Sequence, residues 1–160
     1  MNYFGIPLSQ LARKPVRVPL FHAVPGRARR DGWTPLKQAE FIGELAETRS
    51  VTEAARRLGL TRETAYRLRR RKWSASFVAA WDAALGRKET RRAETFGANG
   101  LVHPSRKVTN AELEWRVETG IWRVILRDGR YCGVHRKADN SALLALLRRG
   151  DAARERTGRR

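Results

Sequence analysis

The sequence predicts a mainly α (α+β) protein in which several helices are followed by a short helix, a β-hairpin and a C-terminal helix. Apolar residues recur at the spacing of amphipathic helices between residues 34 and 86. Residues 121–126 and 131–136 are rich in β-branched and aromatic residues, and they flank Asp128-Gly129, a strong signal for a two-residue hairpin turn. With 160 residues, the chain is long enough for one ordinary domain or for two small modules that share a modest core.

The chain is strongly basic, with 34 Lys and Arg residues against 16 Asp and Glu residues and a formal net charge of +18. Such a charge repels itself in the free protein and attracts phosphate backbones or anionic lipid. The sequence has no run of about 20 apolar residues and no amphipathic helix with a large apolar face, so we expect nucleic acid and no membrane partner. Prolines interrupt residues 1–20, where a secretion signal needs an unbroken apolar run, and we therefore expect a cytoplasmic, nucleoid-associated protein.

Residues 1–33 are predicted to form a basic, partly flexible N-terminal arm. The stretch mixes Pro, Gly and Arg, as in residues 25–30, and shows no sustained apolar period. Scattered apolar residues leave open that part of the arm packs on the body; these are Leu8, Leu11, Val16, Val18, Leu20 and Phe21.

Residues 34–86 are predicted to form a helical domain of four helices. Thr34-Pro35 opens the first helix with a cap residue and a proline at the first helical position. Ser50 and Glu53 make a capping box for a second, short helix, in which the Ser50 side chain accepts from the Glu53 N–H and the Glu53 carboxylate reaches back to Ser50. Gly59 ends this helix, because glycine tolerates left-handed backbone.

Thr61 caps the third helix, which is predicted to run to about Lys72 and is the most basic stretch of the chain. Ala65 and Leu68 are expected on its inner side. A fourth helix is predicted to end near Gly86, and one apolar stripe marks it: Phe77, Val78, Trp81, Ala84 and Leu85.

Residues 87–108 are predicted to be a helical extension that fades into a linker. Residues 109–150 then form a helix, β-hairpin and helix module. Thr109 and Glu112 make its first capping box, and the last helix, capped by Asp139, Asn140 or Ser141, is expected to end before Gly150. Residues 151–160 are predicted to be a charged tail.

The spacing of small and apolar residues within residues 51–70 predicts a helix-turn-helix. Two short helices that cross near a right angle need a small residue at their closest approach, which Ala55 supplies, and a turn four positions later, which Gly59 supplies. Positions that must be buried are apolar: Ala54, Leu58, Leu60, Ala65 and Leu68.

The third helix offers the side-chain types that read base edges in the major groove. Arginine bonds guanine O6 and N7, glutamate accepts from cytosine N4, and ring or methyl surfaces contact the thymine methyl group. The predicted base-reading residues are Thr61, Arg62, Glu63, Tyr66 and Arg67. The predicted phosphate contacts are Arg69, Arg70, Arg71 and Lys72, together with Ser50 and Thr52 at the N-terminus of the second helix.

Two other interpretations of this pattern stay open. The helix pair is also compatible with a helical hairpin in an unrelated bundle whose arginines form a solvated face, although such a bundle has no need to place its most basic stretch on the helix that would enter the groove. Arginine-rich segments also bind structured RNA, so a basic RNA-binding protein is the main rival among nucleic-acid binders.

Residues 31–85 resemble small helix-turn-helix proteins of alphaproteobacteria, in particular at residues 54–62 and 65–71. Residues 122–147 look like the C-terminal segment of many phage terminase small subunits, in which a hairpin precedes an acidic-Asn pair, here Asp139-Asn140, and a leucine-rich helix. The first resemblance implies a DNA-binding protein without catalysis of its own. The second implies a ring beside a separate nuclease-ATPase subunit. Ala138 stands where that second family usually has an aromatic residue, so we favour a transcriptional regulator over a packaging component.

No constellation for catalysis or metal binding is found. The histidines and the single Cys132 share no spacing with acidic residues, so we expect no enzyme activity, no cofactor and no metal. Trp81 and Trp122 sit in apolar stripes and are expected in the core rather than as stacking platforms for bases. Because helix-turn-helix proteins usually bind paired half-sites, we expect a homodimer on double-stranded DNA.

Overall fold

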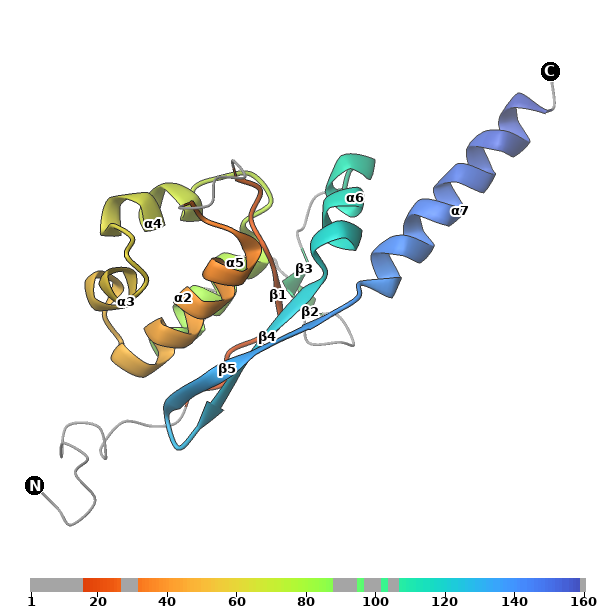
Figure 1. The fold of residues 1–160 in the computed structure, drawn as a ribbon. Coiled ribbons are helices and arrows are strands. Elements are labelled where there is room, and N and C mark those ends of the chain that lie inside the picture. Colours follow the sequence, from red (N-terminus) through yellow and green to blue (C-terminus); the bar gives the residue numbers. More distant parts are fainter. Residues whose placement is uncertain (1–15, 27–31, 88–94, 97–101, 104–106, 159–160) are drawn as a thin grey trace, which may run out of the picture.

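Six helices and a three-stranded antiparallel sheet dominate this computed structural model, which describes residues 16–26, 32–87, 95–96, 102–103 and 107–158 (Figure 1). The predicted mainly α (α+β) fold class is confirmed. The helices are α2 (Pro35–Thr48), α3 (Val51–Arg57), α4 (Arg62–Arg69), α5 (Ala75–Ala84), α6 (Asn110–Thr119) and α7 (Asn140–Thr157). The strands are β1 (Phe21–His22), β2 (Thr95–Phe96), β3 (Val102–His103), β4 (Ile121–Arg127) and β5 (Arg130–Lys137).

Helix α2 lies at the centre of the fold. It begins as predicted, with the Thr34 side chain accepting a hydrogen bond from the Lys37 N–H and with Pro35 in the first turn. Its buried face packs against α3 and α5 on one side and against the sheet on the other. The core contains an aromatic cluster in which the rings of Phe41 and Trp81 lie 4.9 Å apart. Trp81 is 1% exposed, so it is a core residue as predicted.

The predicted β-hairpin is present as β4 and β5, which extend the short β1 into a sheet of order β1-β4-β5. Asp128 and Gly129 at the turn both have positive φ, 51° and 77°, as a tight hairpin turn requires. Trp122 and Val124 of β4 belong to the same core as the helices. The helical region 34–86 and the region 109–150 therefore share one core, which is one of the two arrangements that the sequence left open.

The segment before α2 contributes to the core, so the alternative in which part of the N-terminal arm packs on the body holds within residues 16–26. Phe21 and Val24 have no exposed surface. The buried Gln38 side chain binds both polar groups of Val24, accepting from its N–H at 2.7 Å and donating to its carbonyl oxygen at 2.8 Å. Trp115 Nε1 of α6 donates to the Ala23 carbonyl at 2.7 Å. Residues 1–15 and 27–31 lie outside the described residues.

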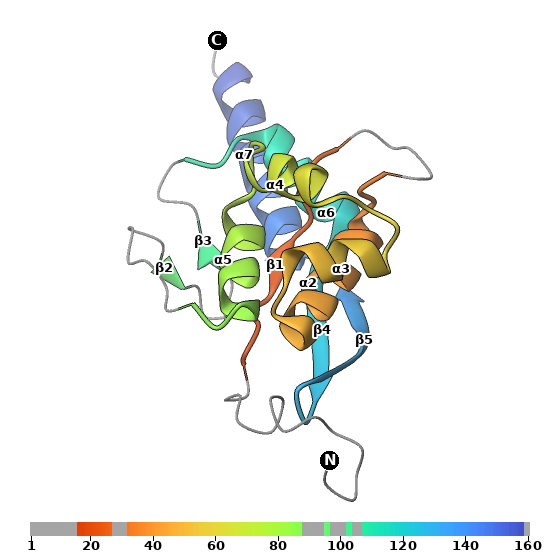
Figure 2. The same cartoon turned by 90° about the vertical axis from the view of Figure 1, so that its left-hand side faces the viewer.

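Helix α7 is longer than predicted and projects away from the rest of the molecule (Figures 1 and 2). It continues through Gly150 to Thr157, so the prediction of a tail from residue 151 is wrong up to that point. The residues after Gly150 include Ala, Arg and Glu, which are strong helix formers. A glycine within an exposed helix costs only about 1 kcal/mol, so the helix can continue through Gly150. Ala142 is the one buried residue among those of α7 that the structure describes.

Most of the predicted linker, residues 87–108, lies outside the described residues. Within it, β2 and β3 pair as a two-stranded antiparallel sheet that the sequence analysis did not predict. Across the described ranges, every helix is too short or too polar to cross a lipid bilayer.

Candidate nucleic-acid interface

The turn between α3 and α4 has the geometry that the sequence predicts. Gly59 adopts the left-handed conformation with φ 67°, and the Leu60 N–H donates to the Ala55 carbonyl oxygen at 2.9 Å. Ala55 is 1% exposed, as expected of the small residue predicted at this crossing. Helices α3 and α4 are therefore joined by a tight turn of the kind that a helix-turn-helix requires, and α2 packs against α3.

Helix α4 is held to the body by one face and exposes the other. Ala65 and Leu68 are buried, and the half-buried Tyr66 ring lies 5.5 Å from the Trp81 ring. Thr61 caps the helix by accepting from the Thr64 N–H, as predicted. The helix ends at Arg69 rather than near Lys72, because the chain turns there toward α5.

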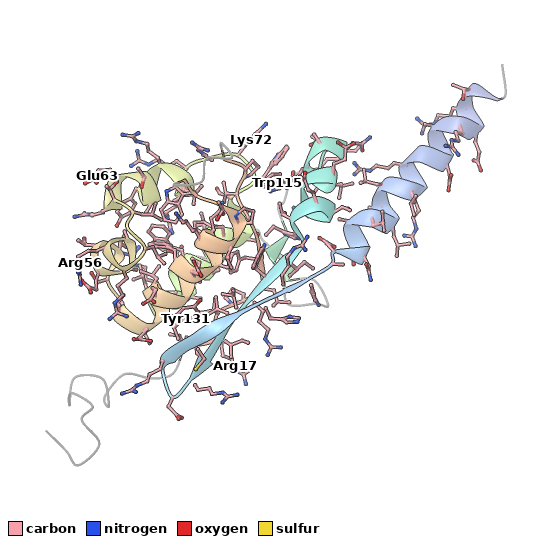
Figure 3. The ribbon with its side chains drawn as sticks, in the orientation of Figure 1. Arg17, Arg56, Glu63, Lys72, Trp115 and Tyr131 are labelled. Carbon is pink, nitrogen blue, oxygen red and sulfur yellow. The ribbon has the colours of Figure 1, made fainter. Side chains whose placement is uncertain are left out.

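The exposed face of α4 carries most of the predicted base-reading residues. Arg62, Glu63, Tyr66, Arg67 and Arg70 line an open hollow of about 580 Å³. The Arg62 guanidinium lies 5.6 Å from the centre of the Tyr66 ring, a favourable cation–π geometry. Figure 3 shows Glu63 on the outer side of the beginning of α4, with Lys72 beyond its end. The predicted residues of this face are thus brought together on one surface.

Arg69, a predicted phosphate contact, does not line this surface and is instead paired with Asp82. Its Nη2 lies 3.0 Å from Asp82 Oδ1 and 3.1 Å from Asp82 Oδ2, and its guanidinium lies 5.3 Å from the centre of the Trp81 ring. Its side chain is 23% exposed. Arg69 therefore ties the end of α4 to α5.

Arg71 and Lys72 follow the helix and remain exposed. Arg71 Nη1 donates to the Pro25 carbonyl oxygen at 3.2 Å, which links the end of the helix-turn-helix to the N-terminal segment. Lys72 Nζ lies 4.5 Å from the centre of the Trp73 ring. Both side chains keep further N–H donors that face solvent.

The beginning of α3 contains only half of the predicted capping box. Ser50 Oγ accepts from the Glu53 N–H at 3.3 Å, as predicted. The Glu53 carboxylate, however, binds Arg56 at 2.7 Å instead of Ser50, and this hydrogen bond lowers the pKa of Glu53. Ser50 and Thr52 are exposed.

The acidic side chains near the helix-turn-helix are concentrated away from the exposed face of α4. Arg57 Nη1 of α3 lies 2.7 Å from Glu44 and 3.2 Å from Glu47, both on α2. By contrast, no ion pair within the described ranges involves Arg62, Arg67 or Arg70. The exposed face of α4 therefore keeps its positive charge, apart from Glu63.

The described residues include no group of three or more His, Cys, Asp or Glu side chains that could hold a metal ion. Cys132 and His135 are both exposed on β5.

The sequence matches no family model, and neither a curated protein nor a solved structure is similar enough to count as a match.

Proposed function

We propose that this protein binds double-stranded DNA by placing α4 in the major groove. The observation that carries the proposal is the set of exposed and unpaired cations on α4 and at its C-cap, namely Arg62, Arg67 and Arg70. The turn at Gly59 holds this helix at the surface. The major groove of B-DNA, about 12 Å wide, admits one α-helix. Bound there, this face meets base edges while the buried side of α4 stays on the body.

The side chains of α4 divide into two groups by position. Arg62, Glu63, Tyr66 and Arg67 lie in the first turns of the helix, where a recognition helix usually contacts bases. Arg70, Arg71 and Lys72 lie beyond the last turn and are better placed for the phosphates at the edge of the groove. The net charge of +18 supports attraction to any phosphate backbone, whatever its sequence. A preference for particular base sequences would come from the side chains in the first turns of α4.

The most direct test is selection of bound duplexes from a random pool with structured RNA as competitor. We expect enrichment of a discrete duplex sequence. Arg62→Ala or Arg67→Ala should weaken binding to this sequence by about 1–3 kcal/mol and should weaken binding to random DNA less. Arg148→Ala, which removes an exposed charge from α7, is the matched control. Major-groove reading would be contradicted if the variants lost equal affinity for the selected and the random DNA. It would also be contradicted if the protein bound the structured RNA and no duplex.

We further propose a regulatory, non-enzymatic role as a homodimer on paired half-sites. The exposed leucines of α7 support self-association: Leu143 is 42%, Leu144 52% and Leu147 55% exposed. A packaging protein of the terminase type would instead form a larger ring. Light scattering on the full chain separates a dimer from a ring, and a ring would favour the packaging role.

A further inference from the structure

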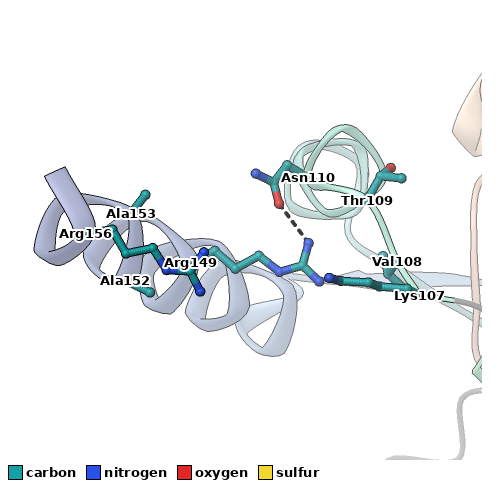
Figure 4. Close-up of a pocket in the computed structure, with 8 residues that line it drawn as sticks. All are labelled: Lys107, Val108, Thr109, Asn110, Arg149, Ala152, Ala153 and Arg156. Carbon is teal, nitrogen blue, oxygen red and sulfur yellow. Dashed lines mark hydrogen bonds between the residues drawn. The ribbon is translucent and has the colours of Figure 1, made fainter.

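We propose a second contact with DNA, in the cleft between the beginning of α6 and the outer half of α7, where it binds the phosphate backbone of a duplex held by α4. This proposal rests on the proposed DNA binding and extends it to a part of the fold outside the helix-turn-helix. Figure 4 shows the cleft and the side chains that line it.

The cleft is built from small and basic side chains. It has a volume of about 610 Å³. Arg149 and Arg156 are seven residues apart and therefore lie on one face of α7, and Ala152 and Ala153 between them leave the space open. Lys107 approaches from the chain that precedes α6.

The positive charge of the cleft is not neutralised by the residues around it. Its described lining residues include no Asp or Glu. Arg149 Nη1 donates to Asn110 Oδ1 at 2.7 Å, and this neutral acceptor positions the guanidinium without cancelling its charge. No ion pair of the described residues involves Lys107, Arg149 or Arg156. Three cations in one open cleft repel one another, and an anion that enters relieves this repulsion.

The position of the cleft favours a duplex over a small free anion. In both views, α4, α6 and the outer half of α7 lie at the same end of the molecule, opposite the tip of the β4–β5 hairpin (Figures 1 and 2). The 18-residue α7 is about 27 Å long and projects from the body. A duplex that passes over α4 and the cations after it would therefore meet the α6–α7 cleft farther along its backbone.

The test compares duplex lengths. The double variant R149Q/R156Q removes two cleft charges, and R148Q/R154Q removes two exposed charges from the same helix outside the cleft, so both have the same net charge. Glutamine is a good helix former, and circular dichroism checks that both variants keep the fold. Binding is measured by fluorescence anisotropy on two duplexes that contain the same α4 site. One has about 12 base pairs, or about one helical turn, and the other has about 30 base pairs, or about three turns.

We expect R149Q/R156Q to bind the long duplex about tenfold more weakly than R148Q/R154Q does, with little difference on the short one. The slope of log affinity against log salt should fall by about 1.8 on the long duplex only. Equal binding by the two double variants at both lengths would overturn the proposal, while the proposed function would stand. Calorimetric binding of inorganic phosphate that needs Arg149 and Arg156, without a length effect, would also overturn it. Failure of the wild-type chain to bind either duplex would instead refute the proposed function itself.

Discussion

Two neighbouring arginines of α4, Arg67 and Arg69, should respond to truncation in opposite ways. Arg67 is exposed and faces the open hollow, whereas Arg69 is 23% exposed and paired with Asp82. We expect R67A to weaken DNA binding and leave stability unchanged. We expect R69A to destabilise the fold and leave the affinity of the folded protein for DNA unchanged.

The structure sets the size of each effect. The Arg69–Asp82 pair is partly buried. An exposed ion pair contributes about 0.2–1 kcal/mol, and removing one partner of a fully buried pair costs about 3–5 kcal/mol, so the expected cost here lies between these values. Loss of the contact with the Trp81 ring adds about 0.5–1 kcal/mol. R69A should therefore lower the free energy of unfolding by about 2 kcal/mol, whereas R67A should change it by less than about 0.5 kcal/mol. For binding, R67A should lose about 1–3 kcal/mol, or about 5- to 150-fold in affinity.

Urea unfolding and fluorescence anisotropy measure the two effects separately. With a urea slope of about 2 kcal/mol/M, the midpoint of R69A should fall by about 1 M. D82A should be destabilised similarly, and the double variant R69A/D82A should lose less than the sum of the two single variants, because both remove the same pair.

The reasoning is refuted if R69A keeps wild-type stability and loses affinity as R67A does. Arg69 would then leave Asp82 in the complex and bind phosphate, as the sequence alone suggested.

Three further outcomes are expected. An added Cβ at Gly43 would clash with the Tyr131 ring, so G43A should cost about 1–3 kcal/mol in chemical denaturation. In a Y131A background the same change should be neutral or stabilising. Burial alone would raise the pKa of Asp139, but hydrogen bonds from His22 and from the Ala142 N–H outweigh this and hold the pKa below its usual value. D139N should therefore cost about 1–3 kcal/mol at neutral pH. The difference from wild type should begin to shrink below about pH 3.9, the unfolded-state value, and should be lost as the pH falls through the lower folded-state pKa; a constant difference would contradict the assignment. Added salt should raise the melting temperature of the free protein, because it screens self-repulsion at +18, while it weakens DNA binding; a melting temperature that falls with salt would show that ion pairs outweigh the repulsion.

Local signals in the sequence predicted the helices and the hairpin. Thr34, Ser50, Thr61, Thr109 and Asp139 all accept a backbone hydrogen bond at the helix starts, as expected of cap residues. The turn at Asp128-Gly129 was predictable for the same reason, since few residue pairs adopt its backbone conformation. These features depend on residues within four positions of one another.

The errors came from contacts between distant residues. The segment around Phe21 has too few apolar residues in a regular period to indicate burial, yet β4, Gln38 and Trp115 give it hydrogen-bond partners up to 101 residues away. The scattered apolar residues of this segment were one hint of burial, and Gln38, a polar residue on the inner side of a helix, was a second. The sequence left open whether the helices and the hairpin belong to one domain, because that also depends on contacts between distant residues.

The charge of this protein illustrates what tertiary structure adds to composition. The sequence shows an excess of arginine but does not show which arginines are neutralised, because Arg57 and Arg69 each have acidic partners 10 to 13 residues away on another helix. Once those pairs are removed, the exposed and unpaired arginines of the helix-turn-helix are Arg62, Arg67 and Arg70, all on or directly after α4. Paired charge then links α3 to α2 and α4 to α5, and the unpaired charge is the part that the proposed DNA binding would use. A solvated helix face would need neither this separation nor the rigid support behind it.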